Sequence, residues 1–175
     1  MQLAIDTLAF DFPDVPLPEV WTVAYHTDAP LLEDVQGATE TALRCFADDP
    51  RLRPGASVAV GVGSRGIANI ALIVRTVVEG LLRQGCRPFI VPAMGSHGGA
   101  TAEGQAGILA AYGVTEAAMG VPVKATMDVV QLGALDDGYP IFFDRNAAEA
   151  DAVVVINRIK HHTDFRGRIE SGLCK

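Results

Sequence analysis

The sequence predicts an α/β fold: a mainly parallel sheet with helices on both faces, plus a β-hairpin near 121–143. Segments typical of strands alternate with segments typical of helices along most of the 175 residues. The strand-like segments are continuously apolar, which is typical of parallel strands buried on both faces. A hydrophobic content of 49% and a charged content of 20% are those of a globular domain with a substantial core.

The first predicted elements alternate as this fold requires. Residues 19–26 (EVWTVAYH) are expected to form a strand, entered from a segment punctuated by prolines. A helix is expected over 31–47, where apolar residues recur on one side. Pro54 and Gly55 then break the chain before residues 56–62 (ASVAVGV), which are typical of a short buried strand.

The helix predicted over 67–84 has the clearest pattern of all. Its apolar residues step by three and four, which makes one apolar stripe, and Gly85 is placed as its C-terminal cap. The next strand is expected over 87–94 (RPFIVPAM). It leads to a helix over 102–112 that Thr101 caps.

Residues 121–143 change character and are expected to form the β-hairpin. Asp137 and Gly138 suit a type I′ turn between its strands. A short helix around 145–150 and a buried strand over 151–159 (DAVVVINRI) complete the alternation. The sequence contains no internal repeat and no low-complexity segment.

Composition and charge argue against two classes of function. A formal net charge of −7, without a run of Lys and Arg longer than two residues, argues against a nucleic-acid-binding face. No apolar run reaches the ~20 residues of a membrane span, and the acidic N-terminal segment lacks the apolar region of a signal peptide. Three scattered cysteines indicate free thiols in a reducing compartment, so we expect a cytoplasmic protein.

Three polar clusters follow predicted strand ends, and the first is rich in glycine. Gly61, Gly63 and Gly66 fit the pattern G-x-G-x-x-G between a strand and a helix. Three interpretations stay open: a dinucleotide site, a turn without a ligand, and an anion site in which Arg65 binds a carboxylate or phosphate. The following strand offers no acidic residue near its end to hold a ribose, which counts against the dinucleotide site.

The second cluster places a histidine among glycines in the segment GSHGG. His97 lies between Ser96 and the pair Gly98 and Gly99, where main-chain N–H groups are able to bind an anion beside the imidazole. A histidine with an ordinary pKa near ~6.5 takes or gives a proton around neutrality. The alternative is a surface histidine without a ligand.

The third cluster contains adjacent histidines and ends on a lysine. His161 and His162 follow the last predicted strand, and neighbours in sequence point to different sides, so we expect one to face the site and the other solvent. Lys175 would act as a nucleophile or attachment point if it were buried among apolar groups, and is otherwise a surface lysine. Because the carboxyl ends of parallel strands meet at one edge, the three clusters predict one shared site.

Four segments resemble the N-terminal part of the nickel-pincer lactate racemase family, over roughly residues 55–175. They are GSRGIANI, PAMGSHGGAT, ADAVVVINRIKHHTDF and IESGLCK, in this order and spacing. The resemblance implies a Rossmann-like domain and enzymes that interconvert the two hands of 2-hydroxy acids. It also implies a nickel-pincer pyridinium mononucleotide cofactor that is tethered to a lysine and accepts hydride.

The same resemblance implies roles for individual residues. His97 and His162 match the two acid/base histidines, Arg65 matches an arginine of the substrate and cofactor pocket, and Lys175 matches the tethering lysine. The nickel ligand of the family lies beyond that lysine, so no metal ligand is expected in this chain. The other residues expected to contact the cofactor are Ser64, Gly66, Ser96, Gly98, Ser171 and Gly172.

The end of the chain affects the expected activity. Residues 157–175 are dense in polar groups, whereas domains usually end in weakly patterned segments. We therefore expect residues 1–175 to be an N-terminal α/β catalytic domain truncated at its C-terminal end, with the second domain absent from this chain. Such a fragment is expected to be inactive alone and to depend on its missing C-terminal region as a partner.

Departures from the family's best-known members leave the substrate open among small 2-hydroxy acids. The chain has GVGSRGI where those members have an Asp-x-Thr-Arg-Pro-like turn, and Ser-His-Gly where they have Thr-His-Arg. His161 stands where a proline is expected. Two alternatives to a racemase remain from the sequence: an NAD-type dehydrogenase and a non-catalytic anion-binding domain.

Overall fold

The computed structural model describes most of the chain between Pro16 and Arg168. The chain separates into two units, Met1–Leu31 and Leu32–Lys175, and all helices and strands of the described residues lie in the second unit. The residues described are 16, 18–24, 26, 28, 30–64, 66–158 and 166–168.

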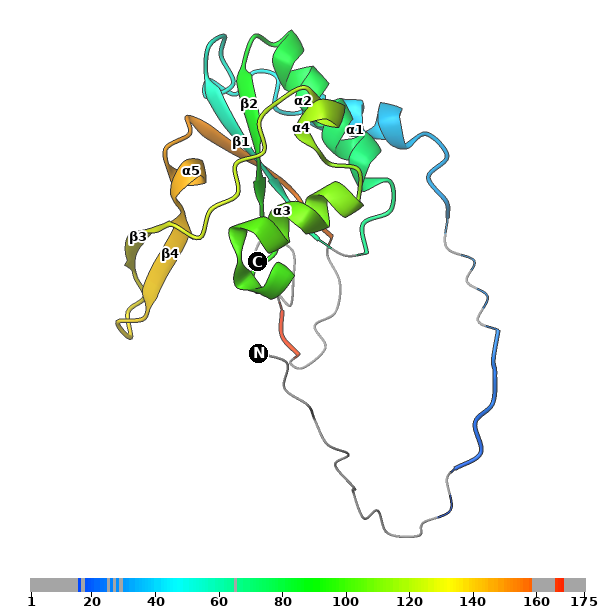
Figure 1. Cartoon of the computed structure of the whole chain (residues 1–175). Helices are drawn as coiled ribbons and strands as arrows, with labels where there is room; N and C mark the ends of the chain where they lie inside the picture. Colours follow the sequence, from blue (N-terminus) through cyan, green and yellow to red (C-terminus); the bar gives the residue numbers. More distant parts are fainter. Residues whose placement is uncertain are drawn as a thin grey trace. The chain divides into compact units, whose positions relative to one another are not determined.

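Three parallel strands form the central sheet in the order β2-β1-β5 (Figure 1). The middle strand, β1 (Ser57–Val62), pairs in parallel with β2 (Arg87–Pro92) on one side and with β5 (Ala152–Ile156) on the other. Every residue of β1 after the first is buried. A strand buried on both faces needs an unbroken apolar sequence, and this is why SVAVGV predicts its position well.

One face of the sheet carries the larger part of the core. Val58, Val60 and Val62 of β1 point to this face and are fully buried against α2 (Ile70–Arg83). The apolar stripe of α2 meets them through residues such as Leu81, which is also fully buried. Three further helices complete this layer: α1 (Val35–Arg44), which packs against α2, α3 (Ala102–Ala111) and α4 (Glu116–Met119).

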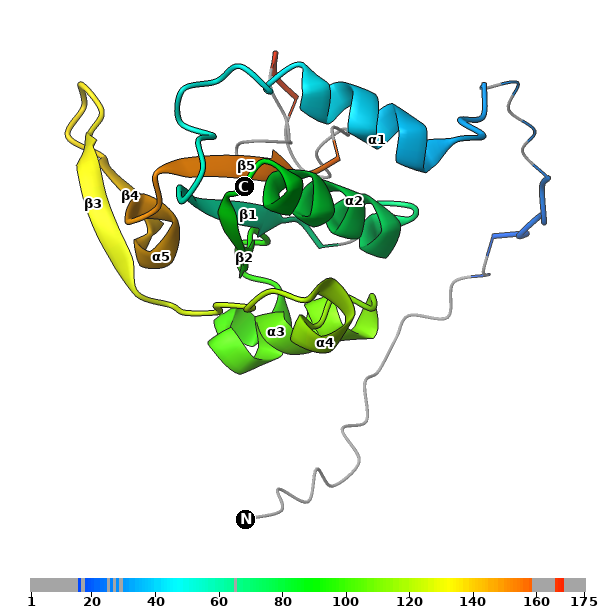
Figure 2. The ribbon, with the colours of Figure 1, turned by 90° about the horizontal axis from the view of Figure 1, so that it is seen from above.

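The opposite face is covered more thinly. Ala59 and Phe89 form a small cluster there with Ala147 of α5 (Arg145–Ala148). Figure 2 shows α2 on one side of the row of strands and α5 on the other. Val153 and Val155 of β5 share the face of Ala59, and they remain 39% and 41% exposed. The predicted α/β fold with helices on both faces is confirmed. The helices bury more of the sheet on the α2 face than on the α5 face.

The antiparallel hairpin consists of β3 (Val129–Ala134) and β4 (Pro140–Asp144). Its turn differs from the predicted type I′, because that turn needs positive φ at two central residues and only Gly138, at φ 83°, has it. Gly138 N donates to Leu135 O at 2.8 Å, so the chain reverses over a longer loop. The part before β3 is not in the hairpin: Val123 forms a parallel bridge with Ile90 of β2.

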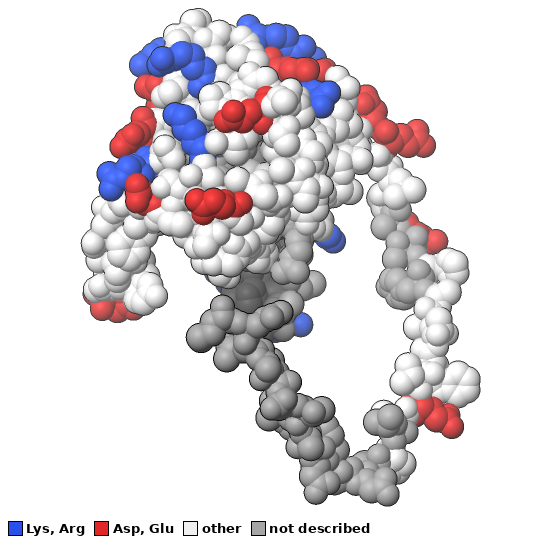
Figure 3. All heavy atoms as spheres, in the orientation of Figure 1, with Lys and Arg blue, Asp and Glu red and all other residues white. Residues whose placement is uncertain are grey.

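Apolar side chains of the hairpin are exposed. Leu132, Tyr139 and Phe142 have 61%, 69% and 57% of their surface accessible. In Figure 3 this part of the molecule is mainly uncharged, with acidic atoms at its tip. The hairpin therefore adds little to the main core.

Two helices begin later than their apolar patterns predict. α1 begins at Val35 because the Asp34 side chain accepts from Gly37 N at 2.8 Å and caps it. α2 begins at Ile70 because the preceding chain adopts left-handed conformations at Gly66, φ 76°, and Asn69, φ 56°. Among the helices of the described residues, none has both the length and the apolar character needed to cross a bilayer.

The strand predicted at 19–26 is wrong for the described residues of that segment, 19–24 and 26. None of them is in a strand. Val20, Trp21 and Val23 are between 78% and 92% exposed. β-branched and aromatic residues favour a strand only where a neighbouring strand and a packed face are available, and the described residues of this segment pair with no strand.

A carboxylate joins the starts of β1 and β5. Asp151 Oδ2 accepts from Ser57 N at 2.8 Å and from Ser57 Oγ at 2.7 Å. The main-chain hydrogen bond, followed by that of the hydroxyl, holds the pKa of Asp151 below its ordinary value of 3.8. The ionised carboxylate therefore ties together two strands that lie 94 residues apart in sequence.

Replacing Asp151 with alanine is expected to lower the thermal midpoint of unfolding at pH 7. Because the pKa is depressed in the folded state, the stabilising effect is present above the ordinary pKa and is lost as the pH falls through the folded-state pKa. Thermal melts of wild type and D151A should differ most near neutrality, and the difference should decline as the pH falls below about 3.8 and disappear below the lower folded-state pKa. The control D136N, at the exposed hairpin tip, should show no such convergence, and a D151A difference that persists at low pH would contradict the assignment.

Candidate functional site

The candidate site lies where β1, β2 and β5 end. Parallel strands bring their carboxyl ends to the same edge of the sheet, and here main-chain hydrogen bonds continue past the strand ends. Gly63 N donates to Ile156 O at 2.9 Å, and Ala93 N donates to Val62 O at 2.8 Å. The loops after all three strands therefore begin side by side, as the three polar clusters predict.

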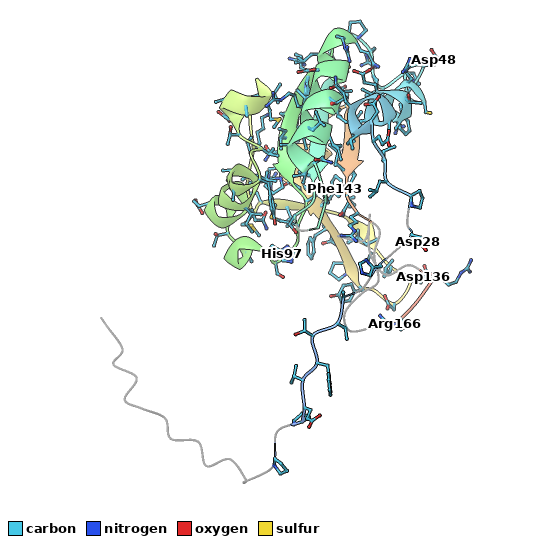
Figure 4. All side chains as sticks on the ribbon, turned by 90° about the vertical axis from the view of Figure 1, so that its right-hand side faces the viewer. Asp28, Asp48, His97, Asp136, Phe143 and Arg166 are labelled. Atoms are coloured by element: carbon cyan, nitrogen blue, oxygen red, sulfur yellow. The ribbon has the colours of Figure 1, made fainter. Side chains whose placement is uncertain are left out.

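A contact between Ser64 and His97 joins the first two clusters. Ser64 Oγ lies 2.5 Å from His97 Nδ1, a hydrogen bond between residues 33 positions apart in sequence. Both side chains are half-buried. Figure 4 shows His97 in the loop region that leads into α3. The glycine-rich turn after β1 thus places a hydroxyl against the imidazole.

The loop that carries His97 is fixed by a close crossing of two glycines. Gly98 has φ 66°, and a Cβ atom there would lie 2.5 Å from Gly104 C and 2.6 Å from Gln105 N. A Cβ atom at Gly104 would in turn overlap the carbonyl of Gly98. Only glycine lets these two stretches of backbone touch, so Gly98 and Gly104 have a packing role.

Side chains of α3 hold the same loop through hydrogen bonds. Gln105, only 6% exposed, donates from Nε2 to Gly95 O at 2.7 Å. Thr101 Oγ1 donates to Gly98 O at 3.2 Å and accepts from Gly104 N at 3.1 Å. Residues on both sides of His97 are therefore tied to the first turns of α3.

The loop after β5 contributes Asn157 and Arg158, which sequence reasoning did not single out. Arg158 NH1 donates to Gly66 O at 2.6 Å, which brings a guanidinium onto the turn after β1. A Cβ atom at Gly63 would lie 2.8 Å from Asn157 Oδ1, so the β5 loop approaches this glycine closely and a side chain there would require the Asn157 amide to shift. The only available signal was that both residues directly follow a buried strand.

Five of the predicted site residues lie in the described part of the chain. The structure brings Ser64 and His97 together, and it places Gly66 under Arg158. Ser96 is exposed, and Gly98 packs on Gly104. The remaining predicted residues lie outside the described residues: Arg65, His161, His162, Ser171, Gly172 and Lys175.

The glycine pattern after β1 differs in geometry from a dinucleotide fingerprint. In that fingerprint the glycines open the helix, whose N-terminus holds the pyrophosphate. Here α2 begins at Ile70, and Asn69 before it is left-handed. Among the described residues, no group of three or more His, Cys, Asp or Glu side chains is placed to hold a metal ion.

Comparison with known proteins identifies the family. No curated protein matches the sequence. A family model described as the lactate racemase N-terminal domain matches residues 51–167, about two thirds of the chain. The match includes Ser64, His97 and the position of His162, and it ends before Lys175. The chain therefore belongs to the lactate racemase N-terminal domain family.

Proposed function

We propose that this chain is the N-terminal catalytic domain of an isomerase that interconverts the two hands of a small 2-hydroxy acid. Membership of a lactate racemase family supports a racemase. The observation that carries the assignment to this site is the 2.5 Å contact between Ser64 Oγ and His97 Nδ1 at the carboxyl edge of the sheet. It holds a group able to transfer protons at the edge where open α/β sheets bind their ligands.

Inversion of the carbon explains the need for two histidines. The hydrogen on the carbon must leave from one face and return to the other, so one acid/base group is required on each side. His97 serves one face from the β2 loop, where it takes the hydroxyl proton of the substrate and gives it back. His162, which follows β5 in the sequence, is proposed for the other face.

Cationic groups are proposed to bind the carboxylate. Arg65, which follows β1 in the sequence, is proposed because a guanidinium fork matches a carboxylate in two parallel hydrogen bonds. Arg158 places a guanidinium on the turn after β1 through its 2.6 Å hydrogen bond to Gly66 O. A permanent positive charge at this turn suits an anionic substrate.

The described residues fit a nickel-pincer pyridinium mononucleotide in the chemistry of their donors. Arg158 and Ser64 are suited to anionic phosphate and polar ribose groups. A Cβ atom placed at Gly95 or Gly99 would meet no atom of the described residues within 4 Å, so these residues leave open space beside the His97 loop. Lys175 would tether the group, and Ser171 and Gly172, with Ser96 and Gly98, would contact it. When bound, such a group supplies reversible acceptance of a hydride.

Racemisation by the full-length natural protein, produced together with the enzymes that make the cofactor, tests the proposal. Single enantiomers of lactate and of larger 2-hydroxy acids should convert to mixtures, measured by chiral chromatography. In D2O the hydrogen on the inverted carbon should be retained, because hydride does not exchange with solvent. Intact-protein and peptide mass spectrometry should find the adduct on Lys175.

The possible results of these experiments test the isomerase reaction and the tethered cofactor separately. Absence of racemisation for every acid, with Lys175 loaded, would overturn the isomerase assignment. An active protein with unmodified Lys175 would overturn the tethered cofactor alone. Complete exchange of the carbon-bound hydrogen with solvent would show proton abstraction in place of hydride transfer.

A further inference from the structure

We infer that Arg158 determines the substrate class: one edge of its guanidinium binds a second anionic group, so the substrate is a 2-hydroxy acid with two acid groups. This inference rests on the proposed function, in which Arg65 takes the carboxylate beside the inverted carbon. It makes Arg158 a specificity-determining residue of the same site.

The guanidinium of Arg158 is held at one nitrogen. Nη1 donates to Gly66 O at 2.6 Å, and a Cβ atom at Gly66 would lie 2.9 Å from that nitrogen. The main chain of Arg158 is held separately, because its N–H donates to Asn157 Oδ1 at 2.8 Å. Arg158 is exposed, so a ligand can reach its side chain. The guanidinium is therefore anchored without being enclosed.

The other edge of the guanidinium is left for a ligand. Nε and Nη2 carry N–H groups that point in parallel, the geometry that a carboxylate accepts as two hydrogen bonds. Within this chain Arg51 makes such a pair, since its Nε and Nη2 donate to the two oxygens of Asp49 at 2.9 and 2.6 Å. The same two nitrogens of Arg158 have no acceptor among the described residues.

The described residues also leave the charge of Arg158 unbalanced. Arg51, Arg53 and Arg83 each form an ion pair with a carboxylate. No described Asp or Glu forms an ion pair with Arg158. The carbonyl of Gly66 accepts a hydrogen bond but carries no net charge. An anion brought by a ligand would therefore pair with this guanidinium.

The location of the guanidinium favours the substrate as the source of that anion. Gly66 belongs to the turn after β1 that also carries Ser64, and Ser64 Oγ lies 2.5 Å from His97 Nδ1. Arg158 is thus bonded to the turn that contacts the proposed proton-transfer group. A 2-hydroxy acid with one carboxylate would satisfy Arg65 alone. A second carboxylate on the same small molecule would satisfy Arg158 as well.

Two acids of equal chain length test the inference. The diacid 2-hydroxybutanedioate has a carboxylate where 2-hydroxybutanoate has a methyl group. Full-length protein that carries the cofactor should racemise the diacid with a kcat/KM at least about tenfold higher. R158Q should lower this preference about 10- to 100-fold, because the charge-assisted pair is lost. R158K keeps the charge without the fork, so its preference should lie between the two.

Binding to the full-length protein without cofactor gives a readout that needs no turnover. Isothermal titration with the diacid should show a dissociation constant raised about 10- to 100-fold in R158Q. R87Q is the matched control, because Arg87 is exposed, begins β2 at the other end of the sheet, and donates from Nε to Gly55 O at 2.9 Å. It should change neither the affinity nor the preference. Thermal midpoints check that the variants remain folded.

The possible results also distinguish this inference from the proposed function. An equal loss for both acids in R158Q, or no loss for either, would overturn the second anionic group. Loss of the Lys175 adduct in R158Q with the preference intact would overturn it too, and would assign Arg158 to a phosphate of the cofactor. Affinity for the diacid that depends on Arg158, without racemisation of any acid by the loaded protein, would support the anion site and overturn the isomerase.

Discussion

Replacing Gly98 with alanine is expected to lower the free energy of unfolding by at least about 3 kcal/mol. Two separate causes act at this position. The backbone has φ 66°, a left-handed conformation that strains any residue with a Cβ atom. The new Cβ would also lie 2.5 Å from Gly104 C, and a backbone atom cannot turn aside as a flexible side chain does.

Three other glycines separate these causes. Gly99 is left-handed, φ 68°, but has open space, so G99A should cost only about 1–2 kcal/mol. Gly104 has ordinary φ but would meet the Gly98 carbonyl, so G104A should cost about 1–3 kcal/mol. Gly107 lies inside α3 with open space and ordinary φ, so G107A should stabilise by about 0.5–1 kcal/mol.

Chemical denaturation of the four variants measures these differences in the free energy of unfolding. The expected order of stability is G107A, wild type, then G99A and G104A, with G98A lowest. Equal stability of G98A and G107A would contradict the close crossing of the two backbones. Equal stability of G98A and G99A would show that strain in the backbone acts alone.

Replacing His97 with glutamine in the full-length protein is expected to lower kcat for racemisation by about 10²- to 10⁴-fold. The glutamine amide is of similar size and can still bond to Ser64, but it cannot take the substrate's hydroxyl proton at neutral pH. KM should change much less, because the arginines proposed to bind the carboxylate are unaltered. Initial rates of racemisation, followed by chiral chromatography, measure both constants.

A second histidine variant serves as the control for the loss of kcat in H97Q. H26Q changes an exposed histidine in the N-terminal unit and should keep the wild-type kcat. Thermal melts should show H97Q folded like the wild type, since the His97 loop is held by Gly98 and Gln105. An H97Q protein with wild-type kcat would remove His97 from the reaction.

The sequence predicts the sheet and its main helices because their patterns are local. The unbroken apolar run of β1 and the stripe of α2 each determine which surfaces are buried. The predictions are wrong where the structure depends on pairing with a distant segment or on the backbone conformation of a single residue. Residues 19–26 have the composition of a strand but no paired neighbour among the described strands, and the hairpin turn depends on which of its residues adopts positive φ.

The candidate site is predictable in outline and not in its contacts. The position of GSHGG after a strand predicts that His97 lies at the edge of the sheet. Its pairing with Ser64 also requires the strand order β2-β1-β5, which no local pattern contains. Arg158 escaped notice for a similar reason, because only the folded chain turns its guanidinium back onto Gly66. The roles of Arg65, His162 and Lys175 stay predictions.

The crossing of Gly98 over Gly104 also has a mechanical consequence. Through it, and through Gln105, the loop of His97 is fastened to α3, of which only Gln105 and Leu109 are buried. The loop and the helix are thus joined to each other while few of their side chains are buried in the core. A displacement of this surface helix is therefore expected to move the His97 loop, so forces applied outside the candidate site would reach the imidazole that is proposed to transfer the proton.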